Sequence, residues 1–497
     1  MSVRQAEKAE TSFSTAFPLH EHDLTRYPSR SVDLLGRLMQ HGHDDSFAAV
    51  TKTSSQLIGQ KTAQVPLQIV IVGAGLGGLS AAIALARRGN QVTVLEQAEK
   101  LGEIGAGIQL PPNSTRLLEE WGVTAHFQDA VVEPDAITLR RWENGTALGI
   151  TRLVPDFRFK FGGPYYLMHR ADFHTALVKC ARQLGVEIRT ASRIISYNSD
   201  ADIPSVETVD GRVFAADLIV AADGIKSLAR STILGGKPSP PLNTGFAAYR
   251  ATVDTSRMRE HADLRWLVES PNINLWIGEN HHVMTYCISG GKKFNMVLSH
   301  PEDGSTFGGT PEGSQPDMEA TLAAMRKQFA GWDPVLEKVI HMIDSTMKWP
   351  MLTGSRLQTW TSESKRIILL GDAAHAMLPY MSQGAAMAVE DAAALAEALG
   401  LIGDKSQIRQ AVDIYESKRM KRAYGMQSAS LVNGKLWHFA DGSEQEARDK
   451  GMRAEVCGTY FSESTNQWSD PVTQNWTYGY DAVRAIQEAW DLGASTL

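Results

Sequence analysis

The sequence predicts an α/β fold in which a Rossmann-like dinucleotide-binding domain is interrupted by an inserted, mostly antiparallel β-sheet and followed by a helical C-terminal region. Three observations predict this fold. A strand, a glycine turn, a helix and a second strand begin near residue 66; short alternating strands replace helical patterns at about 243; and a buried strand with an alanine-rich helix returns after 351. The expected segments are a polar extension, the first nucleotide-binding part, the inserted sheet, the second nucleotide-binding part and the helical region, at 1–65, 66–242, 243–350, 351–400 and 401–497.

The bulk composition excludes several classes of protein. The chain has 497 residues and a net charge of −7, so it lacks the basic excess typical of nucleic-acid binders. Its three cysteines, Cys180, Cys287 and Cys457, lie far apart and form no metal-binding or disulfide pattern. No apolar run is long enough to span a bilayer, and no secretory signal opens the chain. We expect a cytoplasmic protein with no nucleic-acid partner and no stable membrane insertion.

The first 65 residues are polar and weakly periodic, which predicts an arm or a partly disordered extension. Two pairs of histidines, at 20 and 22 and at 41 and 43, superficially resemble metal ligands. The polar arm offers no scaffold that would hold them in a fixed geometry, so we expect no metal site.

Ordered structure begins with a strand–turn–helix–strand unit of about 30 residues. An apolar, β-branched run at 67–72 ends at Gly73, and Gly73, Gly75 and Gly78 have the spacing of a dinucleotide-binding turn. The first glycine permits the tight turn, the second lets a pyrophosphate approach the backbone, and the third lets helix and strand pack closely. Glu96 ends the next strand, 18 residues past Gly78, where it could accept hydrogen bonds from a ribose. This unit alone does not distinguish FAD from NAD.

Two later strands also end in turns that contain aspartate and glycine. A strand at 213–220 leads to Asp223-Gly224, and a strand at 366–370 leads to Gly371-Asp372. Ligands bind at the carboxyl ends of strands in open α/β sheets. Either turn alone could be an ordinary aspartate turn, but the three turns in this order indicate one ligand held by two separate parts of the chain.

The rest of the chain supports the expected division. A helix is predicted at 171–184, followed by a strand at 186–189, and sheet strands are predicted at 274–277 and 282–286. The stretch 302–317 is rich in Gly, Ser, Thr and Pro, which predicts a surface loop. A long helix is expected at about 384–399, and a loop rich in Trp and Tyr at 468–480.

Further motifs carry a family resemblance that extends from about 67 to 480. They are Gly-Glu-Ile-Gly-Ala-Gly-Ile-Gln at 102–109 with Pro-Pro-Asn at 111–113, His-Arg-Ala-Asp at 169–172, Gly-Asp-Ala-Ala-His at 371–375, and Trp-Thr-Tyr-Gly-Tyr-Asp at 476–481. With the three turns, these stretches resemble class A FAD-dependent aromatic monooxygenases, similar to salicylate hydroxylases and their fungal relatives in secondary metabolism. The resemblance implies an FAD-binding domain of the GR2 type and a sheet that covers the substrate.

The resemblance also implies roles for individual residues. The glycine turn and Glu96 hold the ADP half of FAD, Arg170 contacts the cofactor, and Asp372 bonds the ribityl chain. Asp223 helps to bind both FAD and the nicotinamide cofactor, for which no separate domain is expected. The residues assigned to the cofactor site are Gly73, Gly75, Gly78, Glu96, Gly107, Arg170, Asp223, Asp372, Gly384 and Ala385, with Pro379 beside the isoalloxazine.

The implied activity is hydroxylation or epoxidation of an aromatic small molecule with NADH or NADPH and O2. Reduced flavin forms a C4a-hydroperoxide whose distal oxygen attacks the ring, and the helix that starts at Gly384 offers backbone donors to stabilise it. An alternative is a flavin oxidase or dehydrogenase of the same fold, and a third is an FAD-fold protein without catalysis. Monomer and homodimer both remain open.

The substrate-binding residues are less clear from sequence. Tyr249 and Arg250 are candidates for the catalytic pocket, since Arg250 could pair with a carboxylate or a phenolate, although it could equally hold two strands together. Trp276 and Tyr286 could face the substrate, although core packing is the simpler interpretation. His375 is expected near the pyrophosphate and not as a base. The charged runs 292–293 and 418–422 are expected to be solvated.

Overall fold

The computed structural model describes residues 62–102, 105–199, 203–302 and 317–494. Most of the expected N-terminal extension, including both histidine pairs, and nearly all of the expected loop at 302–317 lie outside the described residues. In the part of the chain that the structure describes, no helix is long and apolar enough to cross a membrane.

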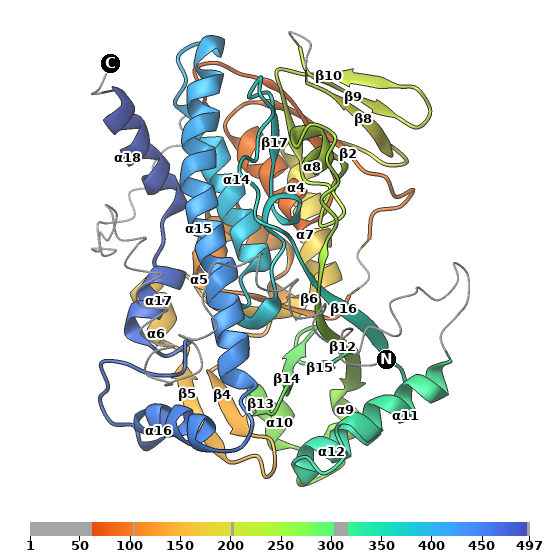
Figure 1. Cartoon of the computed structure of the whole chain (residues 1–497), viewed down its shortest axis with the longest axis vertical. Coiled ribbons are helices and arrows are strands. Elements are labelled where there is room, and N and C mark those ends of the chain that lie inside the picture. Colours follow the sequence, from red (N-terminus) through yellow and green to blue (C-terminus); the bar gives the residue numbers. More distant parts are fainter. Residues whose placement is uncertain (1–61, 103–104, 200–202, 303–316, 495–497) are drawn as a thin grey trace, which may run out of the picture.

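A five-stranded parallel sheet lies in the upper half of the molecule (Figure 1). Its first strand, β1 (Gln68–Val72), lies at the centre and confirms the predicted opening strand. Every residue of β11 is buried, as expected for a parallel strand covered on both faces. The order of strands across the sheet is β17 (Ile367–Leu369), β11 (Leu218–Ala221), β1, β2 (Gln91–Leu95) and β7 (Glu187–Arg189).

Helices rich in small residues pack closely around this sheet. The helix that opens after the glycine turn, α4 (Leu76–Arg87), contacts both α14 (Gly384–Gly400) and α7 (Arg170–Gln183). A Cβ at Gly77 would lie 3.2 Å from the Cβ of Ala388, so the small residues allow α4 and α14 to approach each other. Further helical segments are α5 (Pro112–Glu120), η1 (Val123–His126), η2 (Gln128–Ala130), α6 (Asp156–Phe161), α8 (Leu228–Ile233), α13 (Asp372–His375), η3 (Pro379–Met381) and η4 (Lys405–Gln407).

Two small sheets complete this half of the molecule. The predicted single strand at 213–220 is divided between two sheets, because Asp217 interrupts it and accepts a hydrogen bond from the backbone of Gln68. Its first part joins an antiparallel sheet of three strands and its second part is β11. The small sheets comprise β8 (Ile194–Asn198), β9 (Ser205–Thr208) and β10 (Val213–Ala215), and the pair β3 (Gly107–Leu110) and β6 (Tyr166–His169).

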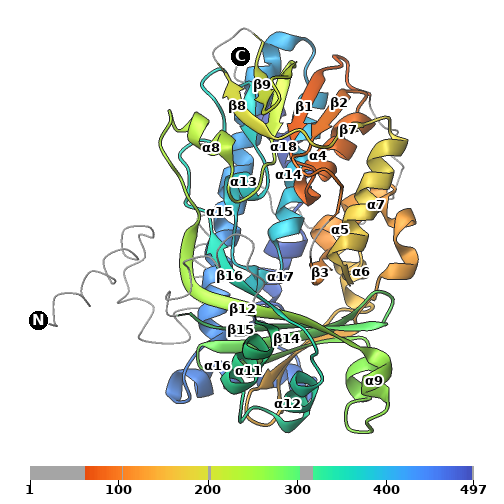
Figure 2. The ribbon, with the colours of Figure 1, turned by 90° about the vertical axis from the view of Figure 1, so that its right-hand side faces the viewer.

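A seven-stranded, mostly antiparallel sheet lies below the cofactor half (Figure 2). The predicted strands at 274–277 and 282–286 are confirmed as β13 and β14. The sheet also contains β4 and β5, which come from outside the predicted range 243–350. β4 pairs in parallel with β13, and its Ile137 and Leu139 lie in the same core as Ile273. The order is β16 (Met347–Thr353), β12 (Leu242–Asp254), β15 (Lys293–Pro301), β14 (His281–Ile288), β13 (Asn272–Gly278), β4 (Ala136–Arg141) and β5 (Ala147–Arg152).

Figure 2 shows α9 (Thr255–Arg259), α11 (Met318–Gln328) and α12 (Pro334–His341) below this sheet, on the side away from the cofactor half, and α10 (Trp266–Glu269) contacts α9 and β14. The core there contains Phe294 and Met296 of the sheet and Leu336 and Val339 of α12. The sheet is therefore covered on one face by helices and on the other by the cofactor half.

The C-terminal region is helical, as predicted, and connects the two halves. The longest helix, α15 (Ile408–Trp437), runs along most of the molecule beside α14 (Figure 1). It is followed by α16 (Ser443–Cys457), α17 (Pro471–Tyr478) and α18 (Ala482–Ala494). The prediction of a loop at 468–480 is wrong for residues 471–478, which form α17. Pro471 suits the first turn of a helix, and the Asp470 carboxylate caps this helix by accepting a hydrogen bond from the Thr473 amide.

A buried charge cluster joins α14 to α15. Arg419 donates to Glu390 and to Asp391 at 2.7 Å each, and Arg422 donates a second pair of bonds to Glu390. Both arginines are buried, so the prediction of a solvated face at 418–422 is wrong for these two residues. Burial alone would raise the pKa of Asp391, but the charges of His375 and Arg419 outweigh it and hold the pKa at about 2.

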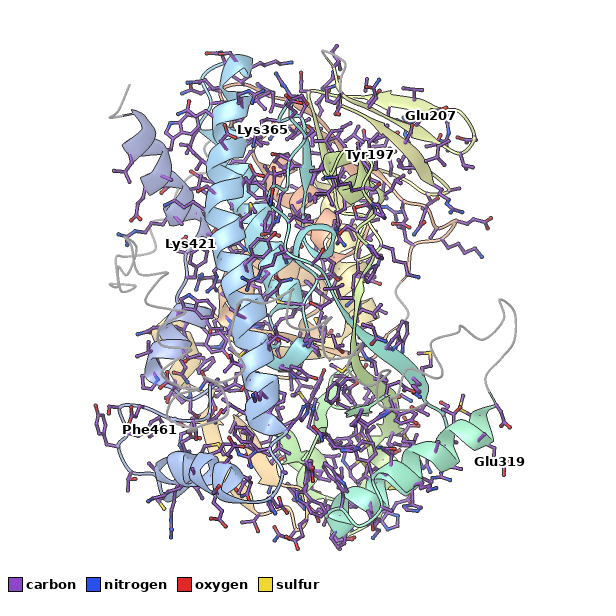
Figure 3. The ribbon with its side chains drawn as sticks, viewed as in Figure 1. Tyr197, Glu207, Glu319, Lys365, Lys421 and Phe461 are labelled. Carbon is purple, nitrogen blue, oxygen red and sulfur yellow. The ribbon has the colours of Figure 1, made fainter. Side chains whose placement is uncertain are left out.

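Replacing Arg419 by methionine should destabilise the protein by about 3–5 kcal/mol, because it leaves two buried carboxylates without their shared cation. Denaturant unfolding of the holoprotein measures this change. The matched control is Lys421→Met on the same helix, since Lys421 is exposed (Figure 3) and should change stability by less than about 0.5 kcal/mol.

The same cluster predicts that the free energy of unfolding falls at acid pH. The pKa of Asp391 is lowered from 3.8 to about 2, so its contribution is complete above about pH 4 and is lost as the pH falls toward 2. Equal stabilities of wild type and Arg419→Met at pH 7 would contradict this account of the cluster.

Candidate active site

A cavity of about 420 Å³ lies between the parallel sheet and the seven-stranded sheet. The three turns at the ends of β1, β11 and β17 lie above the cavity, and side chains of β12, β14, β15 and β16 lie below it. From the cofactor half it is lined by Gly75, Leu76, Gly107, Arg170, Ala222, Gly224, Gly371, Asp372, Pro379, Gln383, Gly384 and Ala385, and from the lower sheet by Arg250, His282, Met284, Tyr286, Val297, Ser299, Trp349 and Met351.

In the first glycine turn, Gly73 and Gly78 lie too close to neighbouring backbone to carry a side chain. Gly73 has a φ of +102°, and a Cβ at Gly78 would lie 2.0 Å from the Gly73 carbonyl oxygen. Glu96 braces the turn, because its Oε2 accepts from the Ala74 amide at 2.7 Å. Of these residues only Gly75 is next to the cavity, and a Cβ there would meet nothing within 4 Å. Gly73, Gly78 and Glu96 shape the turn, and Gly75 presents its backbone to the cavity.

The second turn is held by its own aspartate. Oδ2 of Asp223 accepts from the Leu228 amide at 2.9 Å and from the Tyr197 hydroxyl at 3.2 Å, which ties the turn to α8 and β8. The other oxygen, Oδ1, is buried without a hydrogen-bond partner among the described residues. Asp223 does not itself line the cavity, whereas its neighbour Gly224 does.

The third turn is fixed from behind by a buried arginine that the sequence analysis missed. Arg230 donates to the backbone carbonyls of Asp372 and Ala373 at about 3.0 Å, and the Gly371 amide donates to Asp391 at 3.1 Å. These bonds leave the Asp372 side chain facing the cavity. No sequence signal distinguishes Arg230 from a surface arginine, because its role depends on the third turn, more than 140 residues away.

His375 lies behind the third turn and not beside the expected pyrophosphate. Its Nε2 is 2.6 Å from Oδ2 of Asp391, and its side chain is fully buried. It does not line the cavity, so the structure does not support the expected position. The histidine belongs to the charge cluster of α14 and α15, where it helps to fix Asp391.

The start of α14 points at the cavity. Asn113 bridges Gln383 and Glu390, donating to them at 2.9 and 2.7 Å, and so ties the helix start to α5 and to the charge cluster. Gln383 Nε2 is buried without a partner among the described residues, while Gly384 and Ala385 line the cavity. The amino end of a 17-residue helix presents unpaired amides and a positive dipole to whatever lies there.

These residues fit a dinucleotide that extends from the first turn to α14. Gly75, Gly224 and Gly384 line the cavity at points where an added Cβ would meet nothing within 4 Å, so their backbones can approach a ligand. Arg170 and Asp372 add charged side chains between the turns. The lower sheet closes the end at which Pro379 and Ala385 lie. Of the residues that the family resemblance assigns to FAD, Gly75, Gly107, Arg170, Asp372, Gly384 and Ala385 line this cavity.

The lower wall follows the alternation of the strands. On β14, His282, Met284 and Tyr286 line the cavity, and on β12, Ala248 and Arg250 do so. Tyr249 therefore points to the opposite face, where its ring stacks on His300 with centroids 4.7 Å apart. The structure does not bring Tyr249 to the cavity, although it brings Arg250 and Pro379 there. Trp276 is also on the far side, where its ring nitrogen donates to Asp333 at 2.8 Å.

Arg250 is the cation of this wall. Its side chain is half-buried, and its Nε is buried without a hydrogen-bond partner among the described residues. Burial lowers its pKa, an effect that the nearby Tyr286 opposes and the charge of Arg170 reinforces. Burial raises the pKa of Tyr286, so its hydroxyl stays protonated as a donor. Gln109, which accepts from the Tyr165 hydroxyl at 2.6 Å, also bonds to Tyr286.

Comparison with known proteins agrees with this geometry. The family model described as FAD binding domain matches residues 66–430, so the chain belongs to that family. The FAD-dependent monooxygenase OpS4 of Beauveria bassiana is 35% identical over 85% of this chain and 97% of its own length. The 3-hydroxybenzoate 6-hydroxylase 1 of Aquipseudomonas alcaligenes is 34% identical over 84% of this chain and 98% of its own.

A solved structure shows the same fold. The substrate complex of a salicylate hydroxylase matches with a TM-score of 0.68 at 25% identity, covering 85% of this chain and 97% of its own. The predicted resemblance to FAD-dependent monooxygenases is confirmed, and FAD is the cofactor.

Gly75→Ala should weaken FAD binding at least about tenfold, because the methyl group projects into the space where the cofactor backbone contact is made. The fold should be retained, since that methyl group meets no protein atom within 4 Å. FAD titration of the apoprotein gives the affinity, and thermal unfolding of the apoprotein gives the stability. Gly403→Ala, on the exposed surface, is the control and should bind FAD normally.

Proposed function

We propose that this protein uses NADH or NADPH and O2 to hydroxylate an anionic aromatic small molecule, such as a phenol that carries a carboxylate. The observation that carries the proposal is Arg250, a half-buried cation on the cavity wall whose Nε is buried without a hydrogen-bond partner among the described residues. A buried charge is costly unless it is paired, and an anionic substrate would supply the missing partner.

The remaining wall suits an aromatic ring. Met284, Val297 and Met351 are apolar side chains beside Arg250, and Trp437 of α15 closes the same cavity. The Tyr286 hydroxyl and Ser299 offer hydrogen bonds that could orient a ring substituent. Relatives named as hydroxylases of 3-hydroxybenzoate and of 3-amino-4-hydroxybenzoate support an aromatic acid as the substrate class.

FAD, when bound, accepts hydride and activates O2, and the chain supplies orientation and electrostatics. Arg250 binds the anionic group of the substrate and sets the direction of the ring. The amino end of α14 stabilises negative charge that develops near Gly384. The cofactor half and the lower sheet enclose the cavity from two sides and so keep bulk water from the reacting atoms.

A panel of phenols and aromatic acids tests the function. We expect one or more to stimulate NADH or NADPH oxidation and to yield a product one oxygen heavier, with that oxygen derived from ¹⁸O2. An oxidised product without added oxygen would instead support the alternative of a flavin oxidase or dehydrogenase. Absence of any substrate-stimulated consumption, with FAD bound, would contradict catalysis on this class.

Arg250→Met should raise KM for an anionic substrate by roughly 10- to 100-fold, because a charge-assisted hydrogen bond contributes about 1.5–3 kcal/mol. The same variant should change KM little for the matching carboxamide, which lacks the negative charge. Steady-state kinetics with both compounds separates the lost ion pair from general damage to the pocket. An equal loss for both compounds would show that Arg250 acts by packing alone.

A further inference from the structure

A second cavity, of about 730 Å³, adjoins the active site on the side of α15. Leu378 and Tyr380 line both cavities, so the two cavities share a wall. Apolar side chains make up much of the lining of the second cavity, namely Leu242, Phe246, Leu378, Leu431 and Phe439. A cavity of this size and lining is typical of a site for a small apolar ligand or for part of one.

The second cavity begins at a bulge in β12. Residues 244–246 of β12 oppose Met351 of β16 alone, and Gly245 within the bulge has a φ of +74°. The Thr244 hydroxyl closes the bulge by donating to the Met351 carbonyl at 2.6 Å. Bulges bend a strand and change the direction of its side chains. Here Thr244 and Phe246 line the second cavity, whereas Met351 lines the active site.

One face of β12 runs from the active site into the second cavity. Arg250, Ala248 and Phe246 are alternate residues of the strand, so their side chains lie on the same face. The first two line the active site and Phe246 lines the second cavity. At about 3.3 Å per residue, Phe246 lies roughly 13 Å along the strand from Arg250. Because Ala248 carries only a methyl group, this strand places no bulky side chain between the cation and the apolar cavity.

The wall between the cavities has a fixed backbone and one side chain that is free to rotate. Ser430 and Asn433 of α15 donate to the carbonyls of Leu378 and Tyr380 at 2.6 Å each. The Tyr380 ring packs so closely on Gly434 that a Cβ there would displace it. The Leu378 side chain is aliphatic and makes no polar contact, so a change of its rotamer is the simplest way to open the wall.

We propose that the second cavity binds an apolar chain of the substrate, an inference that rests on the proposed function and narrows its substrate class to aromatic acids that carry an alkyl or prenyl substituent. The carboxylate pairs with Arg250, the ring lies over Ala248, and the chain passes Leu378 into the second cavity. A single benzene ring bound at Arg250 does not reach that cavity, whereas a ring with such a chain does. The chain only binds, and the oxygen is added to the ring as before.

A separate ligand, unconnected to the substrate, is the competing occupant of the second cavity. The charged residues of its lining, Glu279 and Lys435, are exposed, so a neutral chain suits its interior better than an ion does. The shared wall and the continuous face of β12 favour an occupant that extends from the active site. The two accounts differ in whether substrate affinity depends on the length of the chain.

The experiment uses the FAD-loaded enzyme and hydroxybenzoates that carry a linear alkyl chain of one to eight carbons at each open ring position. Calorimetric titration gives Kd, and product mass after turnover with ¹⁸O2 shows oxygenation. For the ring position that directs the chain past Leu378, we expect Kd to fall about fourfold for each added CH2 group until the cavity is filled, because each group leaves water. Oxygenation of the methyl compounds with no gain in affinity at any ring position would overturn the proposed subsite and leave the proposed function standing.

Filling the cavity should remove this gain. Leu431→Trp, on α15, should raise Kd of the longest compound at least about tenfold more than Kd of the methyl compound. Leu242→Trp fills the cavity from β12 and should act in the same way, which provides a second variant if the first does not fold. Leu492→Trp makes the same change on the exposed surface of α18 and should keep the wild-type dependence on chain length.

Folded filling variants that keep the wild-type dependence on chain length would overturn the proposed subsite, because the chain would then bind elsewhere. If the wild-type enzyme oxygenates none of the hydroxybenzoates, the proposed function fails and the proposed subsite fails with it.

Discussion

Two adjacent carboxylates of α14 hold the second half of the cofactor site in place. Asp391 accepts from the Gly371 amide and so fixes the third turn, while Glu390 accepts from Asn113, which also bonds Gln383 at the start of α14. Their charges are balanced by Arg419 and Arg422 of α15. Because all four side chains are buried, none can move to water without leaving another buried charge unpaired. The positions of the third turn and of the start of α14 at the cavity depend on this cluster.

The cavity itself follows from the strand periodicity of two sheets. The parallel sheet presents backbone at its carboxyl edge, where glycines keep side chains away from the cofactor. The lower sheet presents alternate side chains, so the residues on each strand are divided between cavity and far core. Arg250 faces the cavity and Tyr249 faces the core for this reason. The upper half therefore presents mainly backbone to the cavity, and the lower half presents mainly side chains.

Much of the cofactor half could be predicted from sequence, because its signals are local. The spacing of Gly73, Gly75 and Gly78 and the strand before them predict the turn, and the structure has it. The substrate wall could not be predicted in the same way. No local sequence signal shows which face of β12 meets the cavity. Neighbouring residues of a strand face opposite sides, so Tyr249 lies in the core although Arg250 lines the cavity. Arg230 was missed because its partners are distant in the sequence, and the buried Arg419 was interpreted as a surface charge.

The pairing of β4 with β13 has a consequence for how the chain reaches this fold. It aligns Ile137 with Ile273 in the middle of the lower sheet, although the strands belong to different sequence segments. The lower sheet therefore cannot be excised as 243–350, since that fragment would expose an unpaired edge on β13. Pairing of such distant strands carries a high loop-closure cost and is slow to form. During synthesis, the β4–β5 pair must wait for more than a hundred further residues before β13 can join it, which leaves the edge of β4 open to misassociation in the nascent chain.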